Sequence, residues 1–226
     1  MVTSVCAACG NHFPDPRPGV CVVCADERQW LPPGGQRWTT LAELAAAGHA
    51  SDVREVEPGL TGIGTDPPVA IGQRSLLVAT SAGNVLWDPS GFIDDAGWLR
   101  PGPGASVRTW AGTLDVLPGV TLIQCGGHFP GSAVLHWAAG ADGRGVLLSG
   151  DTIFVTPGED RVTFVWSAPN RLPLSEAAVT GVWDAVRPYR FDRICGGWWA
   201  PVLRTDAWET VRRSATRYIE HLRGTA

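Results

Sequence analysis

Four cysteines in the first 24 residues constrain this chain more than any other feature of its sequence. They form two pairs with the spacing Cys-x-x-Cys, Cys6 with Cys9 and Cys21 with Cys24, and 11 residues separate the pairs. Each such pair supplies two thiolate ligands from one tight turn, so two pairs at this distance can surround one tetrahedral Zn²⁺. We therefore predict one zinc ion bound by these four cysteines. A coincidental grouping or a redox pair is the alternative interpretation.

The segment that holds the four cysteines ends in a turn-forming Pro-Pro-Gly-Gly run at residues 32–35. We expect residues 1–35 to form a zinc ribbon-like module, because a segment of this size has too small a core to fold without a metal. Four thiolates leave no open coordination position, so the zinc would be structural. His12 lies between the pairs and could replace one ligand, although we expect it on the surface of a loop.

The composition of the whole chain excludes several classes of function. All 18 basic residues are arginine, which excludes mechanisms that need a lysine amine, such as a Schiff base or a Walker A phosphate site. A net charge of −4 gives no reason to expect nucleic acid or an anionic membrane as a partner. No apolar run is long enough to span a membrane, and the N-terminus lacks the features of a signal peptide. We therefore expect a cytoplasmic protein.

Short runs rich in β-branched and apolar residues follow from residue 52 onward, separated by Gly, Pro, Asn and Asp. They predict strands at residues 53–56, 75–80, 84–88, 120–125, 133–137, 145–149, 162–166 and 191–195. The sequence therefore predicts a fold in which many strands precede the last helices, as in a layered α+β sandwich.

Helix signals occur at three places in the sequence. Thr40 and Glu43 form a capping box, which predicts a short helix that ends at Gly48. Ser175 is expected to begin a helix whose apolar residues follow helical spacing. A second capping box, Asp206 with Glu209, is expected to begin the last helix.

Two polar residues, His128 and Asp151, each follow a hydrophobic strand at a Gly-containing turn. The segments Gly-Gly-His128-Phe-Pro-Gly-Ser and Ser-Gly-Asp151-Thr resemble the metallo-β-lactamase fold superfamily. In that family the first segment carries a metal ligand, and the aspartate of the second bridges two metals. The strand that ends at Asp88 is similar to a family strand whose aspartate orients the metal-binding loop. Over residues 36–226 the resemblance implies a shortened αββα-type sandwich.

The main metal-binding motif of that family, His-x-His-x-Asp-His, is missing from this chain. The five histidines stand at positions 12, 49, 128, 136 and 221, and no two are two residues apart. Residues 91–106, where the motif would lie, contain no histidine and are too few for its strand and the flanking helices. We therefore predict an internal deletion near residues 91–106. The last family ligand, a histidine after residues 191–195, is also absent, because Gly196 and Gly197 follow instead.

By this comparison, His128 and Asp151 are all that remains of about six expected ligands, with Asp88 as a supporting residue. Even catalytic zinc ions keep three protein ligands, so the residues do not complete a dinuclear site. The residues that could replace the missing ligands each have a plainer interpretation: Asp94 and Asp95 as a turn, Cys125 and Cys195 as core thiols, and His136 as a hydrogen-bonded histidine of a sheet.

We expect a metallo-β-lactamase-like protein whose catalytic function is impaired or changed, and we assign no catalytic residue. One alternative is an active zinc-dependent hydrolase of an ester, thioester or phosphodiester, in which two metals activate a shared water. Another is a non-catalytic scaffold whose zinc module binds a protein partner. A third is an internally deleted form of an active relative, which would expose apolar surface at the excised face. The ligand is thus a small molecule or a protein.

Overall fold

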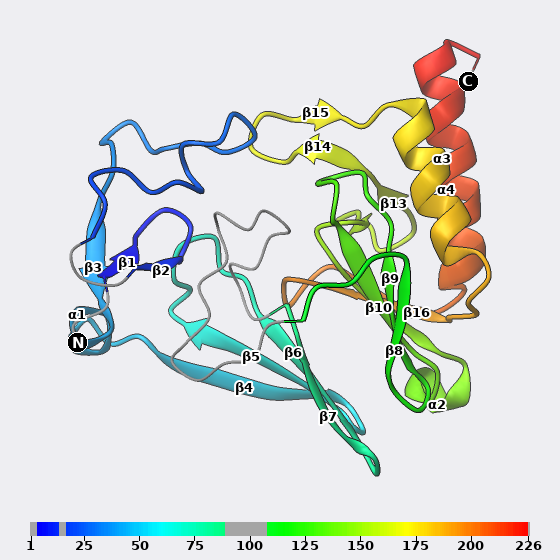
Figure 1. Cartoon of the computed structure of the whole chain (residues 1–226), viewed down its shortest axis with the longest axis horizontal. Helices are drawn as coiled ribbons and strands as arrows, with labels where there is room; N and C mark the ends of the chain where they lie inside the picture. The colour runs from blue at the N-terminus through cyan, green and yellow to red at the C-terminus, as the bar shows by residue number, and fades with distance from the viewer. Residues whose placement is uncertain (1–3, 14–16, 89–107, 226) are drawn as a thin grey trace.

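The structure, a computed structural model, describes residues 4–13, 17–88 and 108–225. Two sheets pack face to face beside a small N-terminal module (Figure 1). The first sheet is an antiparallel meander in sequence order: β4 (Ala50–Glu57), β5 (Leu60–Asp66), β6 (Ser75–Thr80) and β7 (Gly83–Trp87). It therefore consists of strands that are neighbours in the sequence.

The second sheet has six strands in the order β17-β16-β11-β10-β9-β8. Their bounds are β8 (Thr113–Leu117), β9 (Val120–Gln124), β10 (Ala133–Trp137), β11 (Val146–Gly150), β16 (Arg193–Gly196) and β17 (Val202–Leu203). The pair β11 and β16 is parallel, and the other pairs are antiparallel. Two small hairpins join β12 (Phe154–Val155) to β13 (Val162–Thr163) and β14 (Val165–Ser167) to β15 (Leu172–Pro173).

Each central strand of the second sheet contributes to two hydrophobic cores, because successive side chains point to opposite faces. Leu135 and Leu148 pack against the first sheet, where Leu76 is also buried. Val134 and Leu147, their neighbours in the sequence, pack instead against the helices on the other face. Those helices are α3 (Glu176–Val186) and α4 (Ala207–Arg223), and a single turn, α2 (Gly140–Gly143), joins β10 to β11. The α+β class expected from the sequence is confirmed.

The N-terminal module contains β1 (Ser4–Cys6) and β2 (His12–Phe13), which pair with each other. Its third strand, β3 (Trp38–Thr40), lies beyond the expected boundary at residue 35 and pairs with β1. The short helix α1 (Leu41–Ala46) follows directly. His12 is exposed, as expected for a surface position.

Two of the three predicted helix caps are confirmed, and one is wrong. Thr40 and Glu43 make both hydrogen bonds of the capping box, and Ser175 accepts a hydrogen bond from the backbone of α3. Asp206 makes no side-chain cap, because its backbone is left-handed, with φ of 54°. Its carboxylate instead forms an ion pair with Arg213, at 3.1 Å.

Most predicted strands are confirmed within one or two residues, but the stretch 162–166 forms two short strands, β13 and β14, rather than one. Several strands were missed. They are β5, whose Gly62 and Gly64 weaken the strand signal, β8, and the short strands β3, β12, β15 and β17. None of the described helices is both long and apolar enough to span a membrane.

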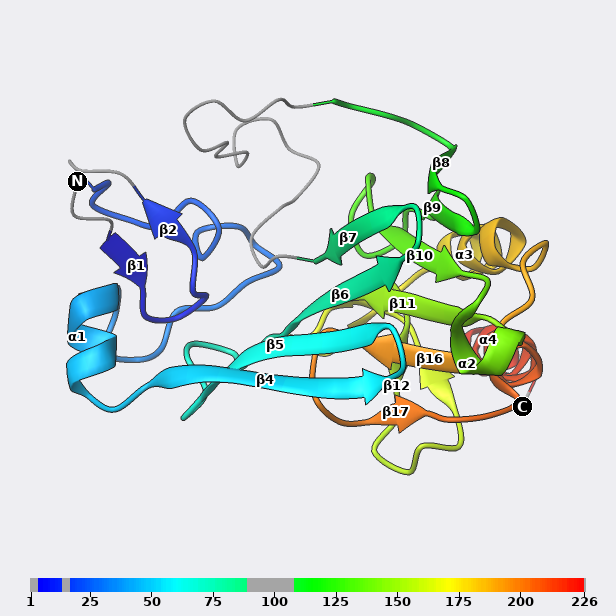
Figure 2. The same cartoon turned by 90° about the horizontal axis from the view of Figure 1, so that it is seen from below.

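The outer face of the first sheet, formed by Val53, Ile63, Leu77 and Leu86, is not covered by a helix of the described residues. Val53 and Leu86 are 60% and 48% exposed. Figure 2 shows α3 and α4 beyond the second sheet, away from this one. In the described part of the chain, the sandwich therefore has one layer of helices where the resemblance implies two. Residues 91–106, where we predict the deletion, lie outside the described residues.

We expect the two faces of the first sheet to differ in their contribution to stability. Leu76 is 1% exposed, so Leu76→Ala should lower the free energy of unfolding by about 2–4 kcal/mol. Leu86→Ala, on the adjacent strand and the outer face, should cost less than about 1 kcal/mol. Urea denaturation of both variants measures the difference. Equal losses would contradict the assignment of a buried inner face and an open outer face.

Candidate functional site

The four N-terminal cysteines form one compact cluster. Their sulfur atoms all lie within 4.8 Å of one another, with Cys6 and Cys24 3.7 Å apart and Cys9 and Cys21 3.6 Å apart. Sulfurs bound at about 2.3 Å around a tetrahedral zinc are separated by about 3.8 Å. The four sulfur atoms are thus close enough together to bind one zinc ion, as the sequence predicted.

The chemistry of the thiols also favours a bound cation. Burial raises the pKa of the Cys24 thiol to about 12. The hydrogen bond between Cys9 and Cys21 raises the pKa of Cys9 and lowers the pKa of Cys21, so one proton is shared within this pair. Four thiolates this close together repel one another, so the cluster would retain protons without a cation. A divalent metal would stabilise the deprotonated form of all four.

Gln36 links the two cysteine pairs, and the sequence analysis missed this role. Its side-chain amide donates a hydrogen bond to the sulfur of Cys6, at 3.2 Å, and its oxygen accepts one from the backbone N–H of Cys21, at 3.0 Å. A glutamine just beyond the turn at residues 32–35 gives no specific signal in a single sequence. Its contacts depend on the pairing of β3 with β1, which brings residue 36 back to the cluster.

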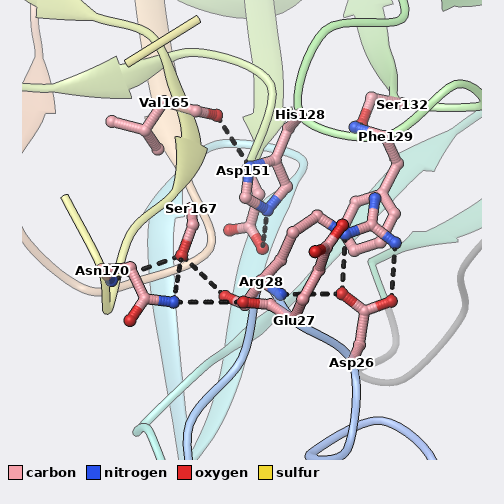
Figure 3. A network of polar contacts seen from close by, with 10 residues as sticks. All are labelled: Asp26, Glu27, Arg28, His128, Phe129, Ser132, Asp151, Val165, Ser167 and Asn170. Atoms are coloured by element: carbon pink, nitrogen blue, oxygen red, sulfur yellow. Dashed lines mark hydrogen bonds and ion pairs between the residues drawn. The ribbon is translucent and has the colours of Figure 1, made fainter. Parts of the chain in front are cut away.

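The segment that follows the second cysteine pair docks against the sandwich domain (Figure 3). Ser167 and Asn170 donate side-chain hydrogen bonds to the backbone carbonyls of Arg28 and Glu27, at 2.7 and 3.3 Å. The guanidinium of Arg28 lies 3.6 Å from the centre of the Phe129 ring. Phe129 is next to His128, so the module reaches the candidate site directly.

The side chain of Asp26 holds the Arg28 guanidinium in this position. Two side-chain hydrogen bonds join them, at 2.8 and 2.9 Å. Such a two-point contact fixes the plane of the guanidinium, and a guanidinium over an aromatic ring is attracted by the ring electrons. The Arg28 side chain therefore acts as a clamp between the module and the loop that carries Phe129.

His128 is held in a defined orientation after β9. The preceding Gly127 has φ of 88°, and a Cβ there would come within 3.1 Å of Leu174 and Val182, so this turn requires glycine. The Nδ1 atom of His128 lies 2.9 Å from the carbonyl oxygen of Val165 and donates to it when the ring is neutral. Burial lowers the pKa of His128, which favours the neutral ring. Its Nε2 atom is then left with a free lone pair.

Asp151 and Asp88 lie near His128 at the same edge of the sandwich. The Asp151 carboxylate follows β11 and lies 3.9 Å from Nε2 of His128, too far for a hydrogen bond. Asp88 follows β7 with φ of 50°, and a Cβ on Gly150 would come within 3.3 Å of its carboxylate. The strand ends of both sheets thus bring together the three positions expected from the sequence.

Burial raises the pKa of both carboxyl groups. The pKa of Asp88 rises to about 7, because of burial and then of the charge on Asp151. The pKa of Asp151 rises to about 6, because of burial. One oxygen of Asp151, Oδ1, is buried and has no hydrogen-bond partner among the described residues. The site therefore favours carboxyl groups that are protonated or matched by a cation.

A cavity of about 420 Å³ opens between these residues and the N-terminal module. The module contributes one wall of it, including Asn11 and Val23, and His128, Asp88 and Asp151 line the other side. A volume of this size suits a small organic molecule. The four-cysteine module and the sandwich domain therefore build one site together.

The substitutes considered for the missing ligands do not join the site in the described residues. His136 is buried in β10 and its Nε2 lies 2.8 Å from the carbonyl oxygen of Arg190, as expected for a sheet histidine. Cys195 is buried in the core between the sheets, and Cys125 is partly buried against the other core. Asp94 and Asp95 lie outside the described residues.

No family model matches the chain, and no solved structure matches it significantly. A curated protein of Bacillus subtilis (strain 168), "Uncharacterized protein YmaE", is 33% identical to it, over 96% of each chain. The alignment extends over 266 positions, whereas this chain has 226 residues. At least 40 positions of the relative therefore have no counterpart here.

We expect purified protein to contain one zinc ion per chain. Replacing Cys6 and Cys9 with Ser removes two of the four ligands and should abolish zinc binding, whereas Cys125→Ser should not affect it. Elemental analysis of the wild type and both variants tests this. Zinc retained in the Cys6→Ser/Cys9→Ser variant would contradict the assignment of the site to these cysteines.

We also expect Asp88 to destabilise the ligand-free protein at neutral and alkaline pH. Its pKa in the fold, about 7, exceeds the ordinary value of 3.8, so the folded state holds a proton that the unfolded chain has lost. The contribution of Asp88 to the free energy of unfolding therefore falls as the pH rises from 3.8 to about 7, and it is constant above that pH. Asp88→Asn should thus raise the free energy of unfolding at pH 8 by about 1–3 kcal/mol.

The measurement is urea denaturation at pH 5.5 and pH 8, with Asp184→Asn on the exposed side of α3 as the control. The gain from Asp88→Asn should be larger at pH 8 than at pH 5.5, and the control should show no such trend. If Asp88→Asn instead lowered the free energy of unfolding at pH 8, the ionised Asp88 carboxylate would have stabilising partners in the fold, which would contradict the prediction.

Proposed function

Because the chain belongs to the same family as YmaE of Bacillus subtilis, whose name states no activity, we propose its function from the site itself. We propose that it is a metallo-β-lactamase-like protein of changed function. It binds a small molecule in the cavity beside His128, and it does not catalyse hydrolysis with a metal pair. The four-cysteine module carries a structural zinc and forms part of the cavity wall.

The observation that carries this proposal is the incomplete ligand set around His128. In the described residues the four N-terminal cysteines are the one group of three or more His, Cys, Asp or Glu ligand atoms within 4.8 Å of one another. His128 and Asp151 approach each other at 3.9 Å without a third such ligand. A catalytic zinc needs three protein ligands and a pair of metals needs more.

Two further observations support a metallo-β-lactamase-like ancestry. Asp88, His128 and Asp151 follow strands of the two sheets and meet at one edge, as the resemblance implies for the metal site. The one helix layer that the described residues form and the longer alignment with the relative both fit a chain that has lost an internal segment. What remains of the site is a cavity with two carboxylates and a neutral histidine.

The position of the zinc module favours this function over a protein scaffold. The surface of the module near Arg28 is occupied by Ser167, Asn170 and Phe129 of the same chain. Val20, Val22 and Trp30 of the module stay exposed, but the part of its surface nearest the cavity is already in contact with the same chain. Here it completes the wall of the cavity, and its zinc would have only a structural effect.

The proposal is tested by metal content and hydrolysis together. We expect one zinc per chain, and no metal-dependent hydrolysis of p-nitrophenyl acetate, bis(p-nitrophenyl) phosphate or an acyl thioester. His128→Ala should change neither result. His221→Ala, on the exposed end of α4, is the matched control.

Two or three metal ions per chain, together with hydrolysis that is lost in His128→Ala and kept in His221→Ala, would overturn the proposal. That result would favour the active hydrolase, with replacement ligands from residues outside the described part of the chain.

A further inference from the structure

The cavity beside His128 combines apolar walls with an acidic floor. Its apolar lining comes from both parts of the chain and includes Val23, Ile71, Trp87, Leu122 and Phe129. Its acidic residues are Asp88 and Asp151. Walls of this kind bury the apolar body of a ligand, and a few polar groups fix its orientation.

In the described ranges, the negative charge of this floor has no basic residue to balance it within the cavity. Among the described residues that line the cavity, none is Arg, and the chain contains no Lys. The nearest guanidinium of the module, that of Arg28, forms its ion pair with Asp26. Two carboxylates that face one small cavity repel each other and lose hydration, so a cation would stabilise both.

The Asp151 carboxylate, which lines the cavity, is not fully hydrogen-bonded. The Oδ1 atom of Asp151 has no hydrogen-bond partner among the described residues, although the side chain as a whole is 35% exposed toward the cavity. Buried carboxylate oxygens are normally hydrogen-bonded, because an unsatisfied one costs about 1–3 kcal/mol. Because Oδ1 itself is buried, a ligand with N–H donors would stabilise the Asp151 carboxylate through the exposed part of the side chain.

The shape of the site favours an organic cation over a metal ion. A metal needs three or more converging ligand atoms, and no third atom joins His128 and Asp151 in the described residues. A cavity of about 420 Å³ is also much larger than an ion. An ammonium or guanidinium group can instead donate to carboxylates that lie farther apart, while its carbon skeleton contacts the apolar walls.

We propose that this cavity binds a small organic cation, an amine or guanidine with an apolar body, whose charged group lies between Asp88 and Asp151. This inference rests on the proposed function, in which the cavity binds a small molecule and holds no catalytic metal. The neutral His128 ring contributes an acceptor, Nε2, for a further N–H of the ligand. Trp87 and Phe129, which line the cavity, would contact the apolar part of the ligand.

The test uses the full chain with its zinc and two pairs of probes of equal size. Phenethylammonium is compared with 2-phenylethanol, and hexylammonium with 1-hexanol, by calorimetric titration and thermal shift. We expect each ammonium to bind about tenfold or more tightly than its alcohol, because the alcohol leaves the buried carboxylates unmatched. Asp151→Asn and Asp88→Asn should each remove most of this preference. Asp184→Asn, on the exposed side of α3, is the matched control and should keep it.

Each outcome has a separate meaning. Equal binding of ammonium and alcohol, or no binding of either, would overturn the inference and leave the proposed function in place if metal content stays at one zinc. Binding of a second Zn²⁺ that displaces the ammonium and confers hydrolysis would overturn the proposed function as well. If an Asp variant fails to fold, the comparison of the two probe pairs on the wild type still shows whether the cavity prefers a cation.

Discussion

The packing of the first sheet on the second is the contact on which the rest of the structure depends. Leu60, Leu76 and Val78 of the first sheet bury their side chains against Leu135 and Leu148 of the second. This contact fixes the relative position of strands that are far apart in the sequence. Because β7, β9 and β11 end at the same edge of the sandwich, the residues that follow them share one cavity.

The four-cysteine cluster extends this arrangement to the other side of the cavity. It brings together two turns of a module with a very small apolar core, in which Phe13 is the largest buried side chain. The proposed zinc would cross-link these two turns. The second turn leads directly to Arg28, which contacts Phe129 beside His128. The segment from the second cysteine pair to Arg28 therefore connects the cysteine cluster to the wall of the cavity.

Much of this arrangement could be predicted from the sequence, because the signals were local. The cysteine spacing predicted the cluster, and the Gly-His and Gly-Asp turns predicted that His128 and Asp151 would lie together. The contacts of Gln36, Arg28 and Ser167 could not be predicted, because each joins segments whose proximity depends on the tertiary fold. The capping box at Asp206 was wrong for a similar reason. Its carboxylate pairs with Arg213, and its backbone N–H donates to Asp192, at 2.7 Å.

The order of strands along the chain has a consequence for synthesis on the ribosome. The four strands of the first sheet are consecutive, joined by two short turns and by the loop of residues 67–74, so this sheet can form from local contacts before the second half of the chain is made. At that stage both of its faces carry apolar side chains in contact with water. The second sheet later covers one face, and it is completed only when β16 pairs in parallel with β11. A chain interrupted before this step presents an open, two-sided sheet, the form of structure that chaperones bind and that aggregates most readily.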